Sequence, residues 1–148
     1  MMFSTRTEYG VRIMVELARR DGAGPVSLTE IAATDELPLA YLEHLAARLR
    51  KADLVQSRRG ARGGYLLARP APDISMAEIV EALEGSIAPI ECISQAADGG
   101  LVCSRETDAD HVCPTKLLWT RVQGSIVGTL QETRLSDLVQ NRPAPVPA

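Results

Sequence analysis

Residues 27–51, SLTEIAATDELPLAYLEHLAARLRK, contain two helix patterns separated by a very short turn. The first helix is predicted for residues 28–35, because Ser27 and Glu30 form the kind of pair that caps a helix start. Pro38 ends the turn and suits the first position of the second helix. That helix carries its leucines on one face and polar and basic side chains elsewhere. Two helices joined in this way predict a helix-turn-helix, whose second helix lies in the DNA major groove.

Another helix pattern precedes this motif. Apolar residues recur at helical spacing over residues 5–20, and Thr5 with Glu8 is expected to cap the start. The run Asp-Gly-Ala-Gly-Pro at residues 21–25 then breaks the chain. We therefore expect one helix ahead of the helix-turn-helix.

Downstream, the pattern changes to that of a β-hairpin. Residues 53–57 and 65–68 read as short strands around the glycine-bearing turn at 58–64. A further helix is predicted for 75–84, again opened by a Ser and a Glu three residues apart. Residues 1–84 are thus predicted to form a winged helix-turn-helix head, in a fold that is mainly α with a small β-hairpin wing.

The charge of the chain is unevenly distributed. The formal net charge is -3, yet residues 1–70 carry 11 Lys and Arg against 8 Asp and Glu, whereas residues 71–148 carry 5 against 11. Residues 48–69 hold seven basic side chains and one acid, Asp53. A local basic surface of this kind favours a nucleic-acid partner despite the acidic total.

The candidate DNA contacts lie in the helix-turn-helix and the hairpin. Glu43 can accept from a cytosine amino group, and the small Ala40 allows close approach to a thymine methyl group. Arginines on the hairpin suit phosphate or minor-groove contact, with an ordinary solvated turn as the alternative. His44 is also explained as an exposed helix residue. The full candidate set is Ser27, Thr29, Pro38, Ala40, Tyr41, Glu43, His44, Arg48, Arg50, Lys51, Arg58, Arg59 and Arg62.

All three cysteines, Cys92, Cys103 and Cys113, occur in one stretch, residues 85–113, that shows no persistent period. This stretch is predicted to be a long loop, and such loops are usually functional or disordered. Thiolate is the ligand that cluster iron prefers, and the cysteines are too widely spaced for a zinc ribbon or finger. The pattern favours ligation of a metal or cluster, and a zinc site that also uses His111 stays open.

Three other interpretations of the cysteines stay open as well. They could form a redox thiol switch, or they could be small buried core residues, although polar neighbours around Cys103 and Cys113 suggest no core face to join. Cys113 with His111 could also be an enzyme nucleophile and base. The sequence carries no oxyanion-hole or substrate-pocket motif, so we expect that the chain is not an enzyme and has no small-molecule substrate.

Helical periodicity resumes at Pro114. Apolar residues at four-residue steps from Leu118 to Leu130 predict a long helix within 114–140, with one stripe that packs and another that dimerises. The proline-rich tail 141–148 is expected to be disordered. No run of 18 apolar residues and no signal-peptide pattern occurs, so a cytoplasmic protein without membrane contact is expected.

The sequence resembles the Rrf2 family of winged-helix transcriptional regulators, and especially its iron-sulfur members of the IscR, NsrR and RirA type. The resemblance extends from the first helix to Leu138. The motifs that carry it are Thr5-Arg-Thr-Glu-Tyr-Gly10, Leu39-Ala-Tyr-Leu-Glu43, Arg48-Leu-Arg-Lys-Ala-Asp-Leu-Val55, Arg59-Gly-Ala-Arg-Gly-Gly-Tyr-Leu-Leu67, Glu81-Ala-Leu-Glu-Gly85, Trp119 and Leu135-Ser-Asp-Leu138.

The resemblance implies a homodimer in which the long helices cross and the two heads bind a near-palindromic double-stranded operator. It also implies that Cys92, Cys103 and Cys113 ligate an iron-sulfur cluster, [2Fe-2S] or [4Fe-4S]. The cluster-binding loop would be residues 85–113. The expected function is a transcriptional regulator, a repressor by preference, that responds to iron-sulfur or iron status, redox or nitric oxide.

The chain departs from the family pattern at the cluster site. IscR and NsrR space their cysteines more tightly, and Lys116 stands where IscR has its histidine ligand. The fourth ligand is therefore open, with Glu8 from the partner subunit, His111 and Glu91 as candidates. The alternative function is a winged-helix repressor without a cluster, controlled by a thiol switch or by a partner.

Overall fold

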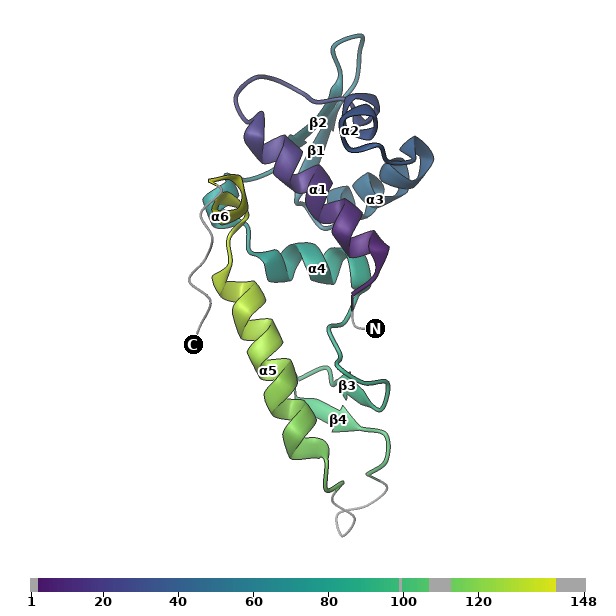
Figure 1. The fold of residues 1–148 in the computed structure, drawn as a ribbon, viewed down its shortest axis with the longest axis vertical. Coiled ribbons are helices and arrows are strands. Elements are labelled where there is room, and N and C mark those ends of the chain that lie inside the picture. The colour runs from purple at the N-terminus through teal and green to yellow at the C-terminus, as the bar shows by residue number, and fades with distance from the viewer. Residues whose placement is uncertain (1–2, 99, 107–112, 141–148) are drawn as a thin grey trace.

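The computed structural model describes residues 3–98, 100–106 and 113–140, so the predicted tail 141–148 and His111 lie outside it. The chain alternates helices with two small hairpins, which Figure 1 shows in order. The elements are α1 (Thr5–Arg19), α2 (Leu28–Asp35), α3 (Leu39–Lys51), β1 (Val55–Arg58), β2 (Gly64–Leu67), the 3-10 turn η1 (Ala71–Asp73), α4 (Met76–Glu84), β3 (Ile93–Gln95), β4 (Leu101–Cys103), α5 (Lys116–Glu132) and α6 (Leu135–Val139).

The core of the head lies where α1, α3 and α4 pack together. Its leucines and isoleucines come from the helix faces that the 3.6-residue period predicts. Gly10 lies where α1 crosses α4, because a Cβ there would lie 2.2 Å from Leu83 Cδ1. The fully buried members of this core include Ile13, Met14, Ile31, Leu42, Leu45, Leu49, Leu54, Ile74, Ile79, Leu83 and Leu135.

Two of the three predicted helix caps are present. At α4 the pair is reciprocal, because the Ser75 hydroxyl accepts from the Glu78 N–H while the Glu78 carboxylate accepts from the Ser75 N–H. At α2 the Ser27 hydroxyl accepts from the Glu30 N–H at 3.2 Å, but the Glu30 carboxylate pairs with Arg20. The caps explain why these helices begin where the sequence pattern places them.

The predicted Thr5 cap is wrong. Thr5 is already the first residue of α1, Ser4 is the N-cap, and no side-chain cap bond occurs at that helix start. Glu8 instead accepts from Arg12 Nε at 2.8 Å, one turn along the same helix. The N-terminal turn of α1 is held from outside by Glu84, whose hydrogen bonds are described below.

The wing consists of β1 and β2, which pair antiparallel from Val55 opposite Leu67 to Arg58 opposite Gly64. Val26 adds a bridge at the outer edge, exchanging backbone hydrogen bonds of 2.9 and 2.8 Å with Tyr65. The chain before α2 is thereby tied to the hairpin, and the observed fold is the predicted winged helix-turn-helix.

Alanine at position 64 is expected to destabilise the head by about 1–3 kcal/mol, the usual cost of overpacking. A Cβ on Gly64 would lie 2.4 Å from the Val26 carbonyl oxygen, so two backbones would have to separate and break the bridge. Urea unfolding of the wild type and of Gly64→Ala measures the loss. An unchanged unfolding midpoint would show that the bridge between Val26 and Tyr65 does not hold the wing.

The prediction that residues 85–113 lack regular structure is wrong at its centre. Strands β3 and β4 form a hairpin in which Ile93 lies opposite Cys103. Its turn is closed by the Ala96 N–H to the Gly100 carbonyl at 2.8 Å and by Asp98, which accepts from the Gly100 N–H. Strands of three residues are too short to show a period of two, which is why sequence pattern missed them.

After the hairpin the chain enters α5, which runs alongside β3 and β4 and returns toward the head (Figure 1). The predicted long helix is thus divided at Thr133 and Arg134, with α6 following. The Leu135 N–H donates to the Ile74 carbonyl at 3.0 Å, and the Met76 N–H donates to the Thr133 carbonyl at 2.9 Å. These bonds fasten the end of α5 to the start of α4. Among the described residues, no helix is both long and apolar enough to cross a membrane.

Candidate functional site

The outer face of α3 is available for DNA. Ala40, Glu43 and His44 are exposed near its N-terminal end, and Arg50 and Lys51 are exposed near its C-terminal end. Pro38 is the N-cap of α3 and so lies just before the predicted first position. Thr29 is exposed at the start of α2. The positions proposed for base and phosphate contacts thus lie on the solvent side of the helix-turn-helix.

Four of the candidate DNA contacts have partners inside the head, among them Arg50, whose Nη1 donates to the Ser57 hydroxyl at 3.3 Å. Tyr41 is half-buried and meets Tyr9 edge to face, with ring centroids 5.8 Å apart. The Arg48 guanidinium donates to the Leu83 carbonyl at 3.1 Å, and the Ser27 hydroxyl caps α2. These side chains hold the recognition unit together, which sequence pattern alone did not indicate.

The tip of the wing carries the exposed arginines. Arg58, Arg59 and Arg62 all lie at the solvent surface. The Gly63 N–H donates to the Gly60 carbonyl at 2.9 Å, and Gly60 has a φ of 120°, so the turn folds back tightly between the arginines. A basic tip on a fixed hairpin suits contact with phosphates or with the minor groove.

The cysteines come together from three segments. Cys92 directly precedes β3, Cys103 ends β4, and Cys113 lies shortly before α5. The Ser104 N–H donates to the Cys92 carbonyl at 2.8 Å, which extends the pairing of the hairpin. Cys113 and Cys92 both lie close enough to the Cys103 thiol to raise its pKa.

Burial of Cys103 corrects the expectation that no core face is available to it. Its side chain is only 1% exposed, opposite the equally buried Ile93. The Arg105 N–H donates to its sulfur and lowers the thiol pKa, but burial and the neighbouring Cys113 and Cys92 outweigh this, so the pKa of Cys103 is raised. Cys103 is therefore the interior member of the group.

Cys113 has the opposite electrostatics. Its sulfur lies 3.4 Å from the Thr115 hydroxyl oxygen. The Thr115 hydroxyl, then the Thr115 N–H, lower the pKa of the Cys113 thiol, and the Lys116 N–H adds to this effect. Donors at the start of a helix stabilise a thiolate. The sequence signal for this arrangement is Cys-Pro-Thr at residues 113–115, directly before a helical pattern.

An ion pair between Lys116 and Glu106 lies beside Cys103 and Cys113. Lys116 Nζ donates to the Glu106 carboxylate at 2.6 Å. That bond lowers the pKa of Glu106 and raises the pKa of Lys116, and the Lys116 ammonium also lies within electrostatic range of Cys103 and Cys113. Lys116, which stands where IscR has a histidine ligand, thus supplies positive charge beside the thiols.

The candidates for a fourth ligand are Glu8 of the partner subunit, Glu91 and His111. Glu8 lies on the exposed face of α1, in the head, where it pairs with Arg12. Glu91 is exposed beside Cys92, and His111 lies outside the described residues. Within the described part of the chain, no three His, Cys, Asp or Glu side chains are arranged to hold a single metal ion.

Comparison with known proteins gives consistent relatives. Residues 3–141 match the Rrf2 family, described as "Iron-dependent Transcriptional regulator". The chain is 38% identical to the HTH-type transcriptional regulator CymR of Bacillus subtilis over 93% of this chain and 89% of that protein. It is 37% identical to the HTH-type transcriptional regulator IscR of Cereibacter sphaeroides, over 100% of this chain and 93% of that protein.

Solved structures share the fold. That of CymR, described as the global cysteine regulator of B. subtilis, has a TM-score of 0.77 at 36% identity and covers 97% of this chain and 99% of its own. The structure of T. potens IscR has a TM-score of 0.75 at 39% identity, and the match covers 95% of this chain and 88% of that one. The chain is similar both to IscR proteins and to a cysteine regulator.

Proposed function

The chain belongs to the Rrf2 family of DNA-binding transcriptional regulators, and on that premise we propose that it is a homodimeric repressor controlled by an iron-sulfur cluster. Cys92, Cys103 and Cys113 would ligate the cluster. The observation that supports this proposal is that Cys103, at the end of β4, lies near both Cys92 and Cys113, which come from separate segments.

The donor set suits an iron-sulfur cluster. Thiolates are the ligands that cluster iron prefers, and the described chain places three cysteines near one another. The description of the Rrf2 family as iron-dependent supports the same assignment.

When bound, the cluster supplies a group that changes with redox state, iron supply or nitric oxide. The residues around it have separate tasks. Burial of Cys103 protects one ligand from solvent, while Thr115 and the first amides of α5 favour the thiolate of Cys113. Lys116 offsets part of the negative charge of a thiolate-rich site. Glu8 of the partner subunit and His111 are the proposed candidates for a remaining ligand.

The exposed apolar surface of α5 supports the proposed homodimer. This helix of 17 residues buries only Gln123 within its own chain. Leu117 is 63% exposed and Leu118 is 54% exposed, and Val122 and Ile126 are half-buried. Apolar residues gathered on one long helix favour a helical partner, and a second copy places two heads on a near-palindromic operator.

Removing Arg59 or Arg62 is expected to weaken DNA binding and to lower the slope of log K against log salt by about 1 per arginine, because each neutralised phosphate releases a counterion. Fluorescence anisotropy of a duplex selected by the wild type from a random library measures the slopes. Arg105→Ala, an exposed arginine in the cysteine-bearing segment, is the matched control. Unchanged slopes in both wing variants would show that the wing does not contact the DNA phosphates.

The regulatory proposal is tested with the same selected duplex. We expect the dissociation constant to differ between anaerobic cluster-loaded protein and the protein stripped of iron, because a signal can act only through different affinities of the two states. Equal affinities, in samples whose iron and sulfide contents differ as intended, would contradict control by the cluster.

A second candidate function, a thiol switch without a cluster, is favoured by the proximity of Cys103 and Cys113. A peroxide would oxidise the two thiols to a disulfide, with two electrons passing to the peroxide and two molecules of water formed from hydrogen peroxide. Peroxide treatment of metal-free protein, followed by peptide mass analysis, distinguishes the candidates. A linked Cys103–Cys113 peptide together with altered DNA affinity supports the switch, and oxidation without any effect on affinity opposes it.

A further inference from the structure

The last turn of α4 is bonded to α1 and to α3. The Leu83 carbonyl accepts from Arg6 Nη1 at 3.3 Å and from Arg48 Nη1 at 3.1 Å. Arg6 belongs to α1, and Arg48 belongs to the recognition helix α3. The Leu83 side chain is fully buried against Gly10 of α1. One residue at the end of α4 therefore fixes the positions of α1 and α3.

Glu84 extends this connection to the start of α1. Its Oε1 accepts from the Ser4 N–H at 2.9 Å and from the hydroxyls of Ser4 and Thr7. Burial alone would raise its pKa, but these hydrogen bonds outweigh burial and lower it. The Glu84 carboxylate thus supplies an anionic partner for a helix start that has no side-chain cap of its own.

The cysteine-bearing segment begins immediately after these residues. Gly85 has a φ of 90°, a conformation that suits glycine, and turns the chain away from α4. Buried Ile87 then accepts a hydrogen bond of 2.7 Å from Gln123 Nε2 of α5. The backbone from Glu84 to Ile87 is thereby held at both ends.

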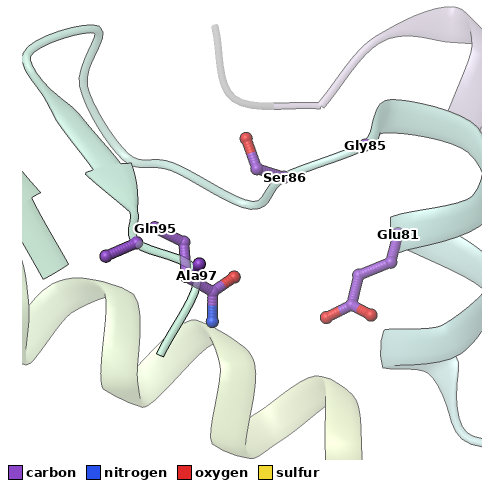
Figure 2. Close-up of a pocket in the computed structure, with 6 residues that line it drawn as sticks. Glu81, Gly85, Ser86, Gln95 and Ala97 are labelled. Atoms are coloured by element: carbon purple, nitrogen blue, oxygen red, sulfur yellow. The ribbon is translucent and has the colours of Figure 1, made fainter. Parts of the chain in front are cut away.

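An open hollow separates α4 from the tip of the β3–β4 hairpin (Figure 2). Glu81 lies on its α4 side, Gly85 and Ser86 lie on the connecting backbone, and Gln95 and Ala97 lie on the hairpin side. Side chains do not fill this space. The described connections between the hairpin and α4 therefore run through the backbone of residues 85–87 and through α5, and not across the hollow.

We propose that Glu84 is a positioning residue that couples the cysteine site to the DNA-binding head. The identity of the signal rests on the proposed function, but the coupling does not. A shift of the hairpin displaces Gly85, and with it the Leu83 carbonyl and the Glu84 carboxylate. The start of α1 and the Arg48 end of α3 follow, which changes how the recognition helix meets DNA.

The first test compares Glu84→Ala with Glu81→Ala. Glu81 lies one turn earlier on α4, is exposed, and makes no side-chain hydrogen bond within the described residues. We measure the affinity ratio of cluster-loaded to iron-stripped protein for the selected duplex, with thermal unfolding and iron content alongside. Couplings between sites are typically about 5- to 150-fold. Glu84→Ala should bring the ratio to within about twofold of one, whereas Glu81→Ala should keep the wild-type ratio.

The second test needs no cluster. Because coupling is reciprocal, binding of the duplex to iron-stripped protein should change hydrogen exchange in residues 86–103. The change should occur in the wild type and Glu81→Ala and vanish in Glu84→Ala. A folded Glu84→Ala variant that keeps the DNA-induced change would overturn the proposal. A wild type without iron or sulfide would instead contradict the proposed function, and the exchange measurement would still decide the coupling.

Discussion

Replacing Cys103 by alanine is expected to abolish the visible absorbance of the anaerobically purified protein and to remove its iron and sulfide. Cys103 is the buried thiol of the group and lies near Cys113, so its loss removes the interior ligand. The cost to folding should be only about 1 kcal/mol, as for a cavity the size of a methyl group. Absorbance, metal analysis and circular dichroism separate the two effects.

Val102→Ala is the matched control for this change. Val102 precedes Cys103 in β4, is 47% exposed and carries no ligating atom. It should retain the iron and sulfide of the wild type while perturbing the same strand. A Cys103→Ala protein with a wild-type spectrum would show that the ligand assignment is wrong.

Aspartate in place of Leu118 is expected to convert the dimer into monomers. Leu118 is 54% exposed within its own chain, so a charge there leaves the fold of the monomer intact. In a dimer through α5 it would be buried, and truncating or charging a central interface residue costs about 2 kcal/mol or more, a rise of about 30-fold in the dimer dissociation constant. Sedimentation velocity over a dilution series measures this constant.

The same substitution should weaken DNA binding without touching the head. Two linked heads gain about 10²- to 10⁴-fold in affinity from the second contact, and monomers lose that gain. Thr120→Asp places the same charge two residues along α5, at another exposed position, and should alter neither property if the interface is confined to the Leu118 face. A dimeric Leu118→Asp protein would exclude this face from the interface.

The head could be predicted closely because its signals are local. Caps at Ser27 and Ser75, the helical period of leucines, and glycines in the wing each act within a few residues, and the structure confirms the elements they predict. The wrong prediction of a cap at Thr5 shows where local sequence signals fail. A local pair predicted its cap, but Ser4 and Thr7 bond to Glu84, which is distant in sequence and close only after folding.

The cysteine site depended on contacts that no local pattern encodes. The β3–β4 strands are too short for periodicity to reveal them, and their pairing is what buries Cys103 opposite Ile93. Likewise, Arg48 is a basic residue on the recognition helix and was expected to contact DNA, yet its guanidinium donates to the Leu83 carbonyl near the end of α4. Sequence identified which residue types matter, whereas tertiary packing decided which of them meet.

Iron and acid-labile sulfide analysis of the anaerobically isolated wild-type protein, with its visible spectrum, tests the central claim most directly. A cluster held by Cys92, Cys103 and Cys113 predicts equal amounts of iron and sulfide, a visible chromophore, and loss of both in each single cysteine variant. Protein isolated under those conditions without iron, sulfide or visible absorbance would contradict the claim.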